Sequence, residues 1–205
     1  MERSTGQISR TEQVLRLAQE NGVLRPRDLE ARGIPRVYLQ LLYEQGKLLR
    51  SGRGLYTLTD GDWTENHSLA EACKYVPHGA ICLLSALAFH NLTTQNPSQI
   101  WIAISPKKHR PQLSYPPLRV VRFSGAALME GIEAHTVEGV PVRVYNPAKT
   151  VADCFKYRRK IGLDVALEAL RDCWRERRAT MDDLWRYAKT CRVANVMRPY
   201  LESLL

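Results

Sequence analysis

The chain has 205 residues, of which 44% are hydrophobic and 25% charged, as in an ordinary globular protein. No apolar run reaches the ~20 residues of a membrane span, and the start MERSTGQISRTEQ lacks the apolar stretch of a signal peptide. We therefore expect a cytoplasmic protein with no membrane contact. The five cysteines and five histidines are dispersed, which predicts reduced thiols and neither a metal nor a cofactor. The net charge of +9 fits a polyanionic partner, and solubility alone explains it equally well.

The first 61 residues predict three short helices followed by a hairpin. Apolar residues recur at helical spacing from residue 11 to the stop signal Asn21-Gly22, and further helices fit residues 26–31 and 35–45. Beyond Gly46, two short apolar runs at residues 47–50 and 55–59 flank the turn Gly52-Arg53-Gly54. This order predicts a winged helix-turn-helix domain over residues 1–61, with residues 59–62 as a linker.

Residues 62–205 predict a larger mixed α+β domain that ends in helices. Strands fit residues 100–104, 118–123, 133–137 and 140–145, and a basic, proline-rich loop fits residues 107–117. Helical periodicity covers residues 65–75, 80–90, 147–158, 163–176, 181–190 and 194–204. The predicted fold class is therefore α+β, with a small N-terminal and a larger C-terminal domain.

The third helix of the N-terminal domain carries side chains suited to reading DNA. Leu39 and Leu42 define its buried side, because helix residues three apart share a face. Four residues lie farthest from that side: Arg36, Val37, Gln40 and Leu41. Arginine can bond to guanine, glutamine to adenine, and an apolar side chain can meet the thymine methyl group. Any solvated helix face could look similar, so Arg36 or Gln40 alone is weak evidence.

The neighbouring elements add basic residues on both sides of this helix. They begin the second helix or lie on the hairpin: Arg25, Arg27, Lys47, Arg50 and Arg53. A winged helix would bring all of these groups toward one duplex, where they would contact phosphates. The prediction is double-stranded DNA binding through the N-terminal domain. The alternative is a non-enzymatic interaction module, or a general transcriptional regulator that binds a protein partner.

Further basic residues gather in three segments of the second domain. They are Lys107, Lys108, Arg110, Lys156, Arg158, Arg159, Lys160, Arg175, Arg177 and Arg178. Cations at helix C-termini are favoured by the helix dipole, which explains about half of this set. The remainder exceeds what dipoles require. We therefore expect a second anion-binding surface, either for flanking DNA or for an RNA.

The sequence offers no catalytic site. His78, Ser85, His90 and Asp153 could form a hydrolytic triad on paper, but no nucleophile-elbow glycine pattern accompanies them. His90 is better explained by its place near a helix end. Thr150 and Asp153 suit the first turns of a helix. There a hydroxyl can cap the helix or form a hydrogen bond with the backbone, and the helix dipole stabilises a carboxylate. We predict no enzymatic activity.

Three stretches resemble one known family. GIPRVYLQLLYEQGKLLRSGRGLY resembles the winged helix of AbiEi-type antitoxins, HGAICLLSALAFHNLTTQNPSQIWIAI the start of that family's C-terminal domain, and VPVRVYNPAKTVADCFKYRRKIGLDVALEAL its hairpin and following helix. Asn91 stands where the family pattern has glycine, and Ala148-Lys149-Thr150 replaces its more usual Arg-Thr ending. The resemblance spans nearly the whole chain.

The resemblance implies a cytoplasmic bacterial antitoxin of a type IV toxin-antitoxin system. Such a protein represses its own operon by binding inverted-repeat DNA through the winged helix. Its C-terminal domain opposes a nucleotidyltransferase-like toxin, and this opposition need not involve a stable complex.

Overall fold

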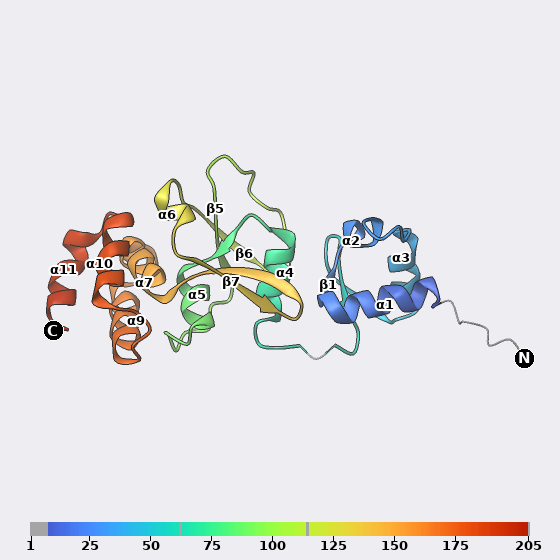
Figure 1. The fold of residues 1–205 in the computed structure, drawn as a ribbon, viewed down its shortest axis with the longest axis horizontal. Coiled ribbons are helices and arrows are strands. Elements are labelled where there is room, and N and C mark those ends of the chain that lie inside the picture. Colours follow the sequence, from blue (N-terminus) through green and yellow to red (C-terminus); the bar gives the residue numbers. More distant parts are fainter. Residues whose placement is uncertain (1–7, 62, 114, 205) are drawn as a thin grey trace, which may run out of the picture.

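The computed structural model describes residues 8–61, 63–113 and 115–204. The polar start at residues 1–7 and Asp62 of the expected linker lie outside the described residues. Figure 1 shows an elongated molecule in which α1 to α3 lie at one end, a sheet lies in the middle, and α9 to α11 lie at the other end. The two regions named below are the winged helix (residues 8–58) and the C-terminal region (residues 63–204).

The predicted winged helix is confirmed. It consists, in chain order, of α1 (Arg10–Asn21), β1 (Val23–Leu24), α2 (Pro26–Glu30), α3 (Val37–Glu44), β2 (Leu48–Gly52) and β3 (Leu55–Leu58). Ser9 starts α1 with a reciprocal capping box, in which its hydroxyl accepts from the Glu12 backbone while the Glu12 carboxylate accepts from the Ser9 backbone. Gly54, at φ +72°, allows the tight turn between β2 and β3.

The winged helix has its own apolar core. Val14, Leu29, Leu39, Leu42 and Leu48, which come from α1, α2, α3 and β2, are buried in it. β3 pairs antiparallel with β1 on one side and with β2 on the other, in the order β1-β3-β2. β1 was not predicted, because two residues are too short to show a periodic pattern.

The C-terminal region is built around a five-stranded mixed sheet in the order β6-β5-β4-β8-β7. Its strands are β4 (Ala80–Ile81), β5 (Ile100–Ile104), β6 (Leu118–Arg122), β7 (Ile132–Val137) and β8 (Val140–Tyr145). Its helices are α4 (His67–Tyr75), α5 (Leu83–Phe89), α6 (Ala126–Met129), α7 (Pro147–Lys156), α8 (Arg158–Ile161), α9 (Leu163–Arg175), α10 (Met181–Thr190) and α11 (Ala194–Glu202). The predicted α+β fold class is confirmed.

Both faces of this sheet are covered. Ile100, Ile102 and Ile104 alternate along β5 toward the face covered by α4, whereas Trp101 and Ala103 point to the face covered by α5 and the C-terminal helices. This double burial explains why β5 reads as a continuous apolar run. The sheet therefore separates the winged helix from the C-terminal helices.

Two expected helices differ in the structure. Residues 80–90 do not form one helix, because Ala80 and Ile81 form β4, which pairs with both β5 and β8, and α5 starts only after the extended Cys82. The helix expected at residues 147–158 stops at Lys156 and is followed by the separate turn α8. Sheet pairing overrides helical spacing at β4.

Asn91, in place of the family's glycine, adopts φ +57°, which asparagine tolerates better than most residues.

The winged helix and the C-terminal region meet in a close contact. A side chain on Gly22 would approach the Glu138 carbonyl oxygen to 2.2 Å, and one on Gly139 would approach the Glu20 carbonyl oxygen to 1.9 Å. The end of α1 is thus seated on the turn between β7 and β8. Val23 and Leu55 of the winged helix also join the apolar cluster beneath α4.

Candidate nucleic-acid interface

The outer face of α3 is open to solvent. Val37 is 62% exposed and Leu41 39% exposed, whereas Leu39 and Leu42 are buried in the core. Arg36, at the start of the helix, and Gln40 are also exposed. The amide of Gln40 donates to the Glu44 carboxylate at 2.7 Å, one turn further along. The four residues expected to face a groove therefore share one accessible surface, and the C-terminal region does not cover it.

Four arginines from three elements converge beside α3. Arg25 and Arg27 at the start of α2, Arg36 before α3, and Arg53 at the tip of the β2–β3 hairpin all line one hollow of about 450 Å³. Arg27, Arg36 and Arg53 are exposed. Lys47 and Arg50 are exposed as well, but they lie on the hairpin outside this hollow.

Arg25 differs from the other predicted contacts, because it also joins the two regions. Its guanidinium donates to the Lys74 carbonyl oxygen at the end of α4, at 2.7 Å, and its side chain is only 29% exposed. Asp28 lies 3.8 Å from Arg25 and also pairs with the Lys74 ammonium at 2.9 Å. Arg25 is therefore held between α2 and α4, with less freedom than Arg53 to follow a ligand.

A second hollow, with Arg110 in its lining, adjoins the first. Its volume is about 650 Å³, its lining includes His78, His109 and Arg110, and it shares Tyr75 with the hollow of the winged helix. The Tyr75 hydroxyl donates to the Gln112 carbonyl oxygen at 2.8 Å, which ties the loop between β5 and β6 to the end of α4. The basic lining of the winged helix thus continues onto the C-terminal region.

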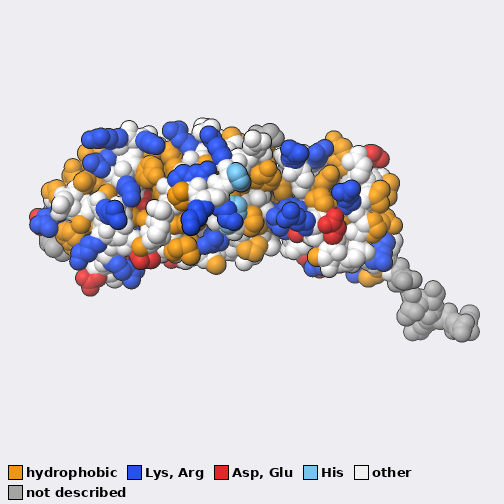
Figure 2. Space-filling model, turned by 90° about the horizontal axis from the view of Figure 1, so that it is seen from above, with side chains coloured by type: hydrophobic (Ala, Val, Ile, Leu, Met, Phe, Trp, Pro, Cys, Tyr) orange, Lys and Arg blue, Asp and Glu red, His pale blue; other side chains and the backbone are white. Residues whose placement is uncertain are grey.

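The basic loop between β5 and β6 is anchored and exposed. Arg122 donates to the carbonyl oxygens of Ser105, at 2.7 Å, and of Lys108. Lys107, Lys108 and Arg110 are exposed. This loop rises above the sheet in Figure 1 and so faces the reader in Figure 2, where lysine and arginine side chains are spread along the whole face from the winged helix to the C-terminal helices.

The other basic residues lie farther along the chain, in two separate places. Arg158 donates to the Phe155 carbonyl oxygen at 2.9 Å, and Lys160 lies over the Tyr157 ring, so these two cations partly serve the α7–α8 junction. Lys156 and Arg159 are exposed beside them. Arg175, Arg177 and Arg178 lie at the corner between α9 and α10 and line a cavity there. The basic residues expected to form a second anion-binding surface are thus divided among three separate places: the β5–β6 loop, the α7–α8 junction and the α9–α10 corner.

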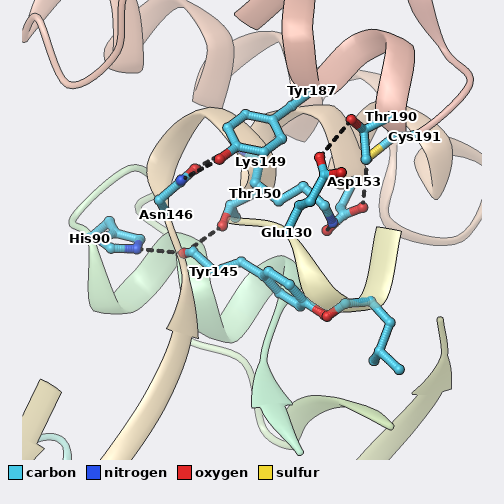
Figure 3. Close-up of polar contacts among 11 residues, drawn as sticks. His90, Glu130, Tyr145, Asn146, Lys149, Thr150, Asp153, Tyr187, Thr190 and Cys191 are labelled. Carbon is cyan, nitrogen blue, oxygen red and sulfur yellow. Dashed lines mark hydrogen bonds and ion pairs between the residues drawn. The ribbon is translucent and has the colours of Figure 1, made fainter. Parts of the chain in front are cut away.

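The C-terminal region contains a buried polar cluster that the sequence did not predict (Figure 3). Lys149 and Asp153, one turn apart on α7, form an ion pair with 2.6 Å between Nζ and Oδ2, and their side chains are 0% and 1% exposed. The Cys191 thiol donates to the other Asp153 oxygen at 3.2 Å. The Lys149 ammonium also lies over the Tyr145 ring, 4.2 Å from its centre. Burial raises the pKa of Asp153, and Lys149 opposes that shift.

This cluster corrects the expected role of Asp153. The Thr150 hydroxyl donates to the Tyr145 carbonyl oxygen at 3.0 Å, so its predicted backbone bond is confirmed. Asp153, which was expected to interact favourably with the helix dipole in the first turns, is instead the buried partner of Lys149. The signal available in the sequence was the i, i+4 spacing of a lysine and an aspartate.

The side chains of the hydrolytic triad considered above do not meet. The Ser85 hydroxyl accepts from the Trp101 backbone at 2.9 Å, and Asp153 is engaged with Lys149. His90 Nε2 donates to the Tyr145 carbonyl oxygen at 2.8 Å, while burial lowers the pKa of His90 and so favours the neutral ring. His90 is thus held by this hydrogen bond rather than by a charge on the helix dipole.

The described residues offer neither a metal site nor a membrane-spanning helix. Among them, no group of three or more histidine, cysteine, aspartate or glutamate side chains is arranged to hold a metal ion. No helix in the same part of the chain combines the length and apolar character needed to cross a membrane.

Comparison with known proteins supports the resemblance at the N-terminal end. Residues 12–59, which run from α1 to just past β3, match the family model described as "Transcriptional regulator, AbiEi antitoxin". No curated protein matches the chain. The family match and the winged helix cover the same segment and agree with the resemblance stated from the sequence. Over this segment, the chain is similar to transcriptional regulators of the AbiEi antitoxin family.

Proposed function

We propose that this protein is the antitoxin of a type IV toxin-antitoxin system that represses its own operon by binding inverted-repeat DNA. In this proposal, residues 1–61 form the DNA-binding domain, and residues 62–205 form the domain that opposes a nucleotidyltransferase-like toxin. The protein acts in the cytoplasm and without enzymatic activity. Direct contact with the toxin is not required.

The observation that carries the proposal is the convergence of Arg25, Arg27, Arg36 and Arg53 on one hollow beside the open face of α3. In helix-turn-helix proteins, residues near the N-terminus of the recognition helix reach base edges, and basic groups around it contact phosphates. We assign the first role to Arg36, Val37, Gln40 and Leu41. We assign the second role to Arg25, Arg27, Lys47, Arg50 and Arg53.

The charge on this face favours DNA over a protein partner. A protein-binding winged helix has little need for exposed arginines on α2, before α3 and on the hairpin at once. Each phosphate that a lysine or arginine neutralises releases counterions, so the affinity for DNA falls steeply as salt rises. Four or five such contacts give a slope of about −4 in a plot of log affinity against log salt.

The test measures binding of the intergenic DNA upstream of the gene by fluorescence anisotropy at several salt concentrations. We expect a specific complex with the slope given above. A slope near zero, or equal affinity for unrelated duplexes, would contradict operator binding and favour the protein-interaction alternative. If the protein binds the operator but does not protect cells that express the toxin, the assignment of the C-terminal domain is wrong.

Three of the basic residues in the C-terminal region, Lys107, Lys108 and Arg110, extend this DNA surface. The hollow that contains Arg110 shares Tyr75 with the winged-helix hollow, so a duplex on the winged helix would continue toward Lys107, Lys108 and Arg110. Replacing these three residues with glutamate should weaken operator binding and reduce the salt slope by about one for each lost phosphate contact. Replacing Arg158, Arg159 and Lys160 with glutamate is the matched control. Equal losses in both variants would mean that only the total charge matters.

A further inference from the structure

The corner between α9 and α10 forms an open cavity of about 750 Å³, within the range of small-molecule sites. Its apolar part is formed by Trp174, Ala179 and Met181, and its basic part by Arg175, Arg177 and Arg178. Trp174 is half-buried and packs on the core of the C-terminal region, so its indole is held in place. The cavity lies at the opposite end of the molecule from the winged helix, as Figure 1 shows for α9 and α10.

Arg177 occupies a position that normally favours glycine. Its φ is +54°, and its backbone N–H closes the end of α9 by donating to the Trp174 carbonyl oxygen at 3.0 Å. Glycine is the usual residue just after a helix, because a side chain in this conformation is strained. Within the described part of the chain, no hydrogen bond or ion pair engages the Arg177 guanidinium. The fold therefore tolerates an arginine that backbone geometry does not favour and whose guanidinium has no hydrogen-bond or ion-pair partner among the described residues.

The other charges around the cavity leave it basic. Arg175 pairs with Asp172 at 2.8 Å, and Arg178 donates to the His90 carbonyl oxygen at 3.1 Å. The acidic lining residue, Asp183, accepts from the Thr180 hydroxyl at 2.7 Å and pairs with Arg186 at 2.9 Å. Since Asp183 is already compensated, Arg177 and Arg178 present uncompensated positive charge to the cavity.

An aromatic face beside guanidinium groups matches one class of ligand. A nucleobase can stack on an indole, and arginine binds phosphate through two parallel hydrogen bonds. We propose that this cavity binds a nucleoside phosphate, with the base against Trp174 and the phosphate on Arg177 and Arg178. The same chemistry is offered by a free nucleotide and by a nucleotide of a single-stranded RNA. This site is independent of the proposed operator binding.

The test uses the full-length protein and isothermal titration calorimetry with ATP, inorganic triphosphate and a short single-stranded RNA. We expect ATP or the RNA to bind, and triphosphate alone to bind about tenfold or more weakly, because stacking on an aromatic side chain is lost. Binding of ATP alone identifies a free nucleotide as the occupant, and binding of the RNA alone identifies a strand. No binding of either, or equal binding of triphosphate, overturns the proposal.

Two arginine-to-glycine variants distinguish a specific phosphate contact in the cavity from the general effect of removing one positive charge. Arg177→Gly removes the phosphate contact while giving the backbone the residue that it favours, so it should fold with an unchanged Tm and bind about tenfold more weakly. Arg192→Gly is the matched control, because Arg192 is another exposed arginine with φ +60° but lies outside the cavity. Equal weakening in both variants would overturn the proposal. Both variants should bind operator DNA like the wild type, whatever becomes of the cavity.

Discussion

The winged helix and the C-terminal region use charged side chains in opposite ways. Among the described residues of the winged helix, Thr57 is the one buried polar side chain, and the predicted DNA contacts other than Arg25 are exposed. The C-terminal region instead buries Glu71, Lys149 and Asp153 in its interior. Exposed charge can meet a partner and contributes little to folding, whereas buried charge must be matched inside the protein. Substitutions in the two regions should therefore affect different properties.

The largest effect is expected from Asp153→Ala. This change leaves the Lys149 ammonium buried without its partner, which should lower the free energy of unfolding by about 3–5 kcal/mol. Urea denaturation followed by circular dichroism measures it. As a control, Lys149→Met combined with Asp153→Leu removes both charges together and should recover much of the lost stability. A cost below 1 kcal/mol for the single change would show that the buried pair does not hold the C-terminal helices together.

On the winged helix, binding should change while stability does not. Arg36→Ala or Gln40→Ala should cost about 1–3 kcal/mol of binding free energy at the operator and relax its sequence preference. Arg53→Ala should weaken all duplexes to a similar degree, as the loss of a phosphate contact does. Anisotropy titrations with operator and scrambled duplexes distinguish these outcomes. If all three variants lose affinity equally for every sequence, the division into a reading helix and a positioning hairpin is wrong.

The smallest effect concerns pH and the contact between α4 and the β7–β8 turn. His67 Nδ1 lies 2.6 Å from the Glu138 carboxylate, and its Nε2 lies 3.5 Å from Glu71. Burial alone would lower the pKa of His67, but the carboxylates of Glu71 and Glu138 outweigh it and raise the pKa. For Glu138, burial would raise the pKa, but the bonds from His67 and Thr64 outweigh it and lower the pKa.

These opposite shifts define a pH window for the contact. The contribution of His67 is complete below its ordinary pKa of 6.5 and is lost as the pH rises through its raised value. That of Glu138 is present above its ordinary pKa of 4.5 and is lost as the pH falls through its lowered value. His67→Ala should therefore reduce stability by about 1 kcal/mol between pH 4.5 and 6.5 and by less at pH 9, as measured by urea denaturation. An equal loss at both pH values would exclude an ionic contribution.

The exposed face of α3 could be predicted from the sequence, but the role of Arg25 could not. Helical spacing alone separates Leu39 and Leu42 from Val37 and Leu41, because the pattern and the burial have the same period. Arg25 appears equivalent to its neighbours in the sequence. Its bond to the Lys74 carbonyl oxygen joins residues 49 positions apart and depends on how the two regions dock.

The same limit applies to the interior of the C-terminal region. The spacing of Lys149 and Asp153 is visible in the sequence, and their complete burial is not, because it depends on α10 covering α7 and on Cys191 reaching the carboxylate. Likewise, residues 80–90 carry a helical pattern, yet Ala80 and Ile81 pair with strands that are distant in the chain. The sequence predicts local periodicity well, but it does not reveal contacts between segments that meet only in the folded protein.

The bond between Arg25 and the end of α4 affects how variants of this protein should be interpreted. An arginine that both lines the basic hollow and fastens α2 to its neighbour serves recognition and architecture together. A screen for altered operator preference would also recover substitutions at position 25. These would change the orientation of the winged helix relative to α4 rather than the bases that α3 prefers. Arg27 lies two residues later, and no described hydrogen bond or ion pair joins its side chain to α4, so it is the position where the two effects can be told apart.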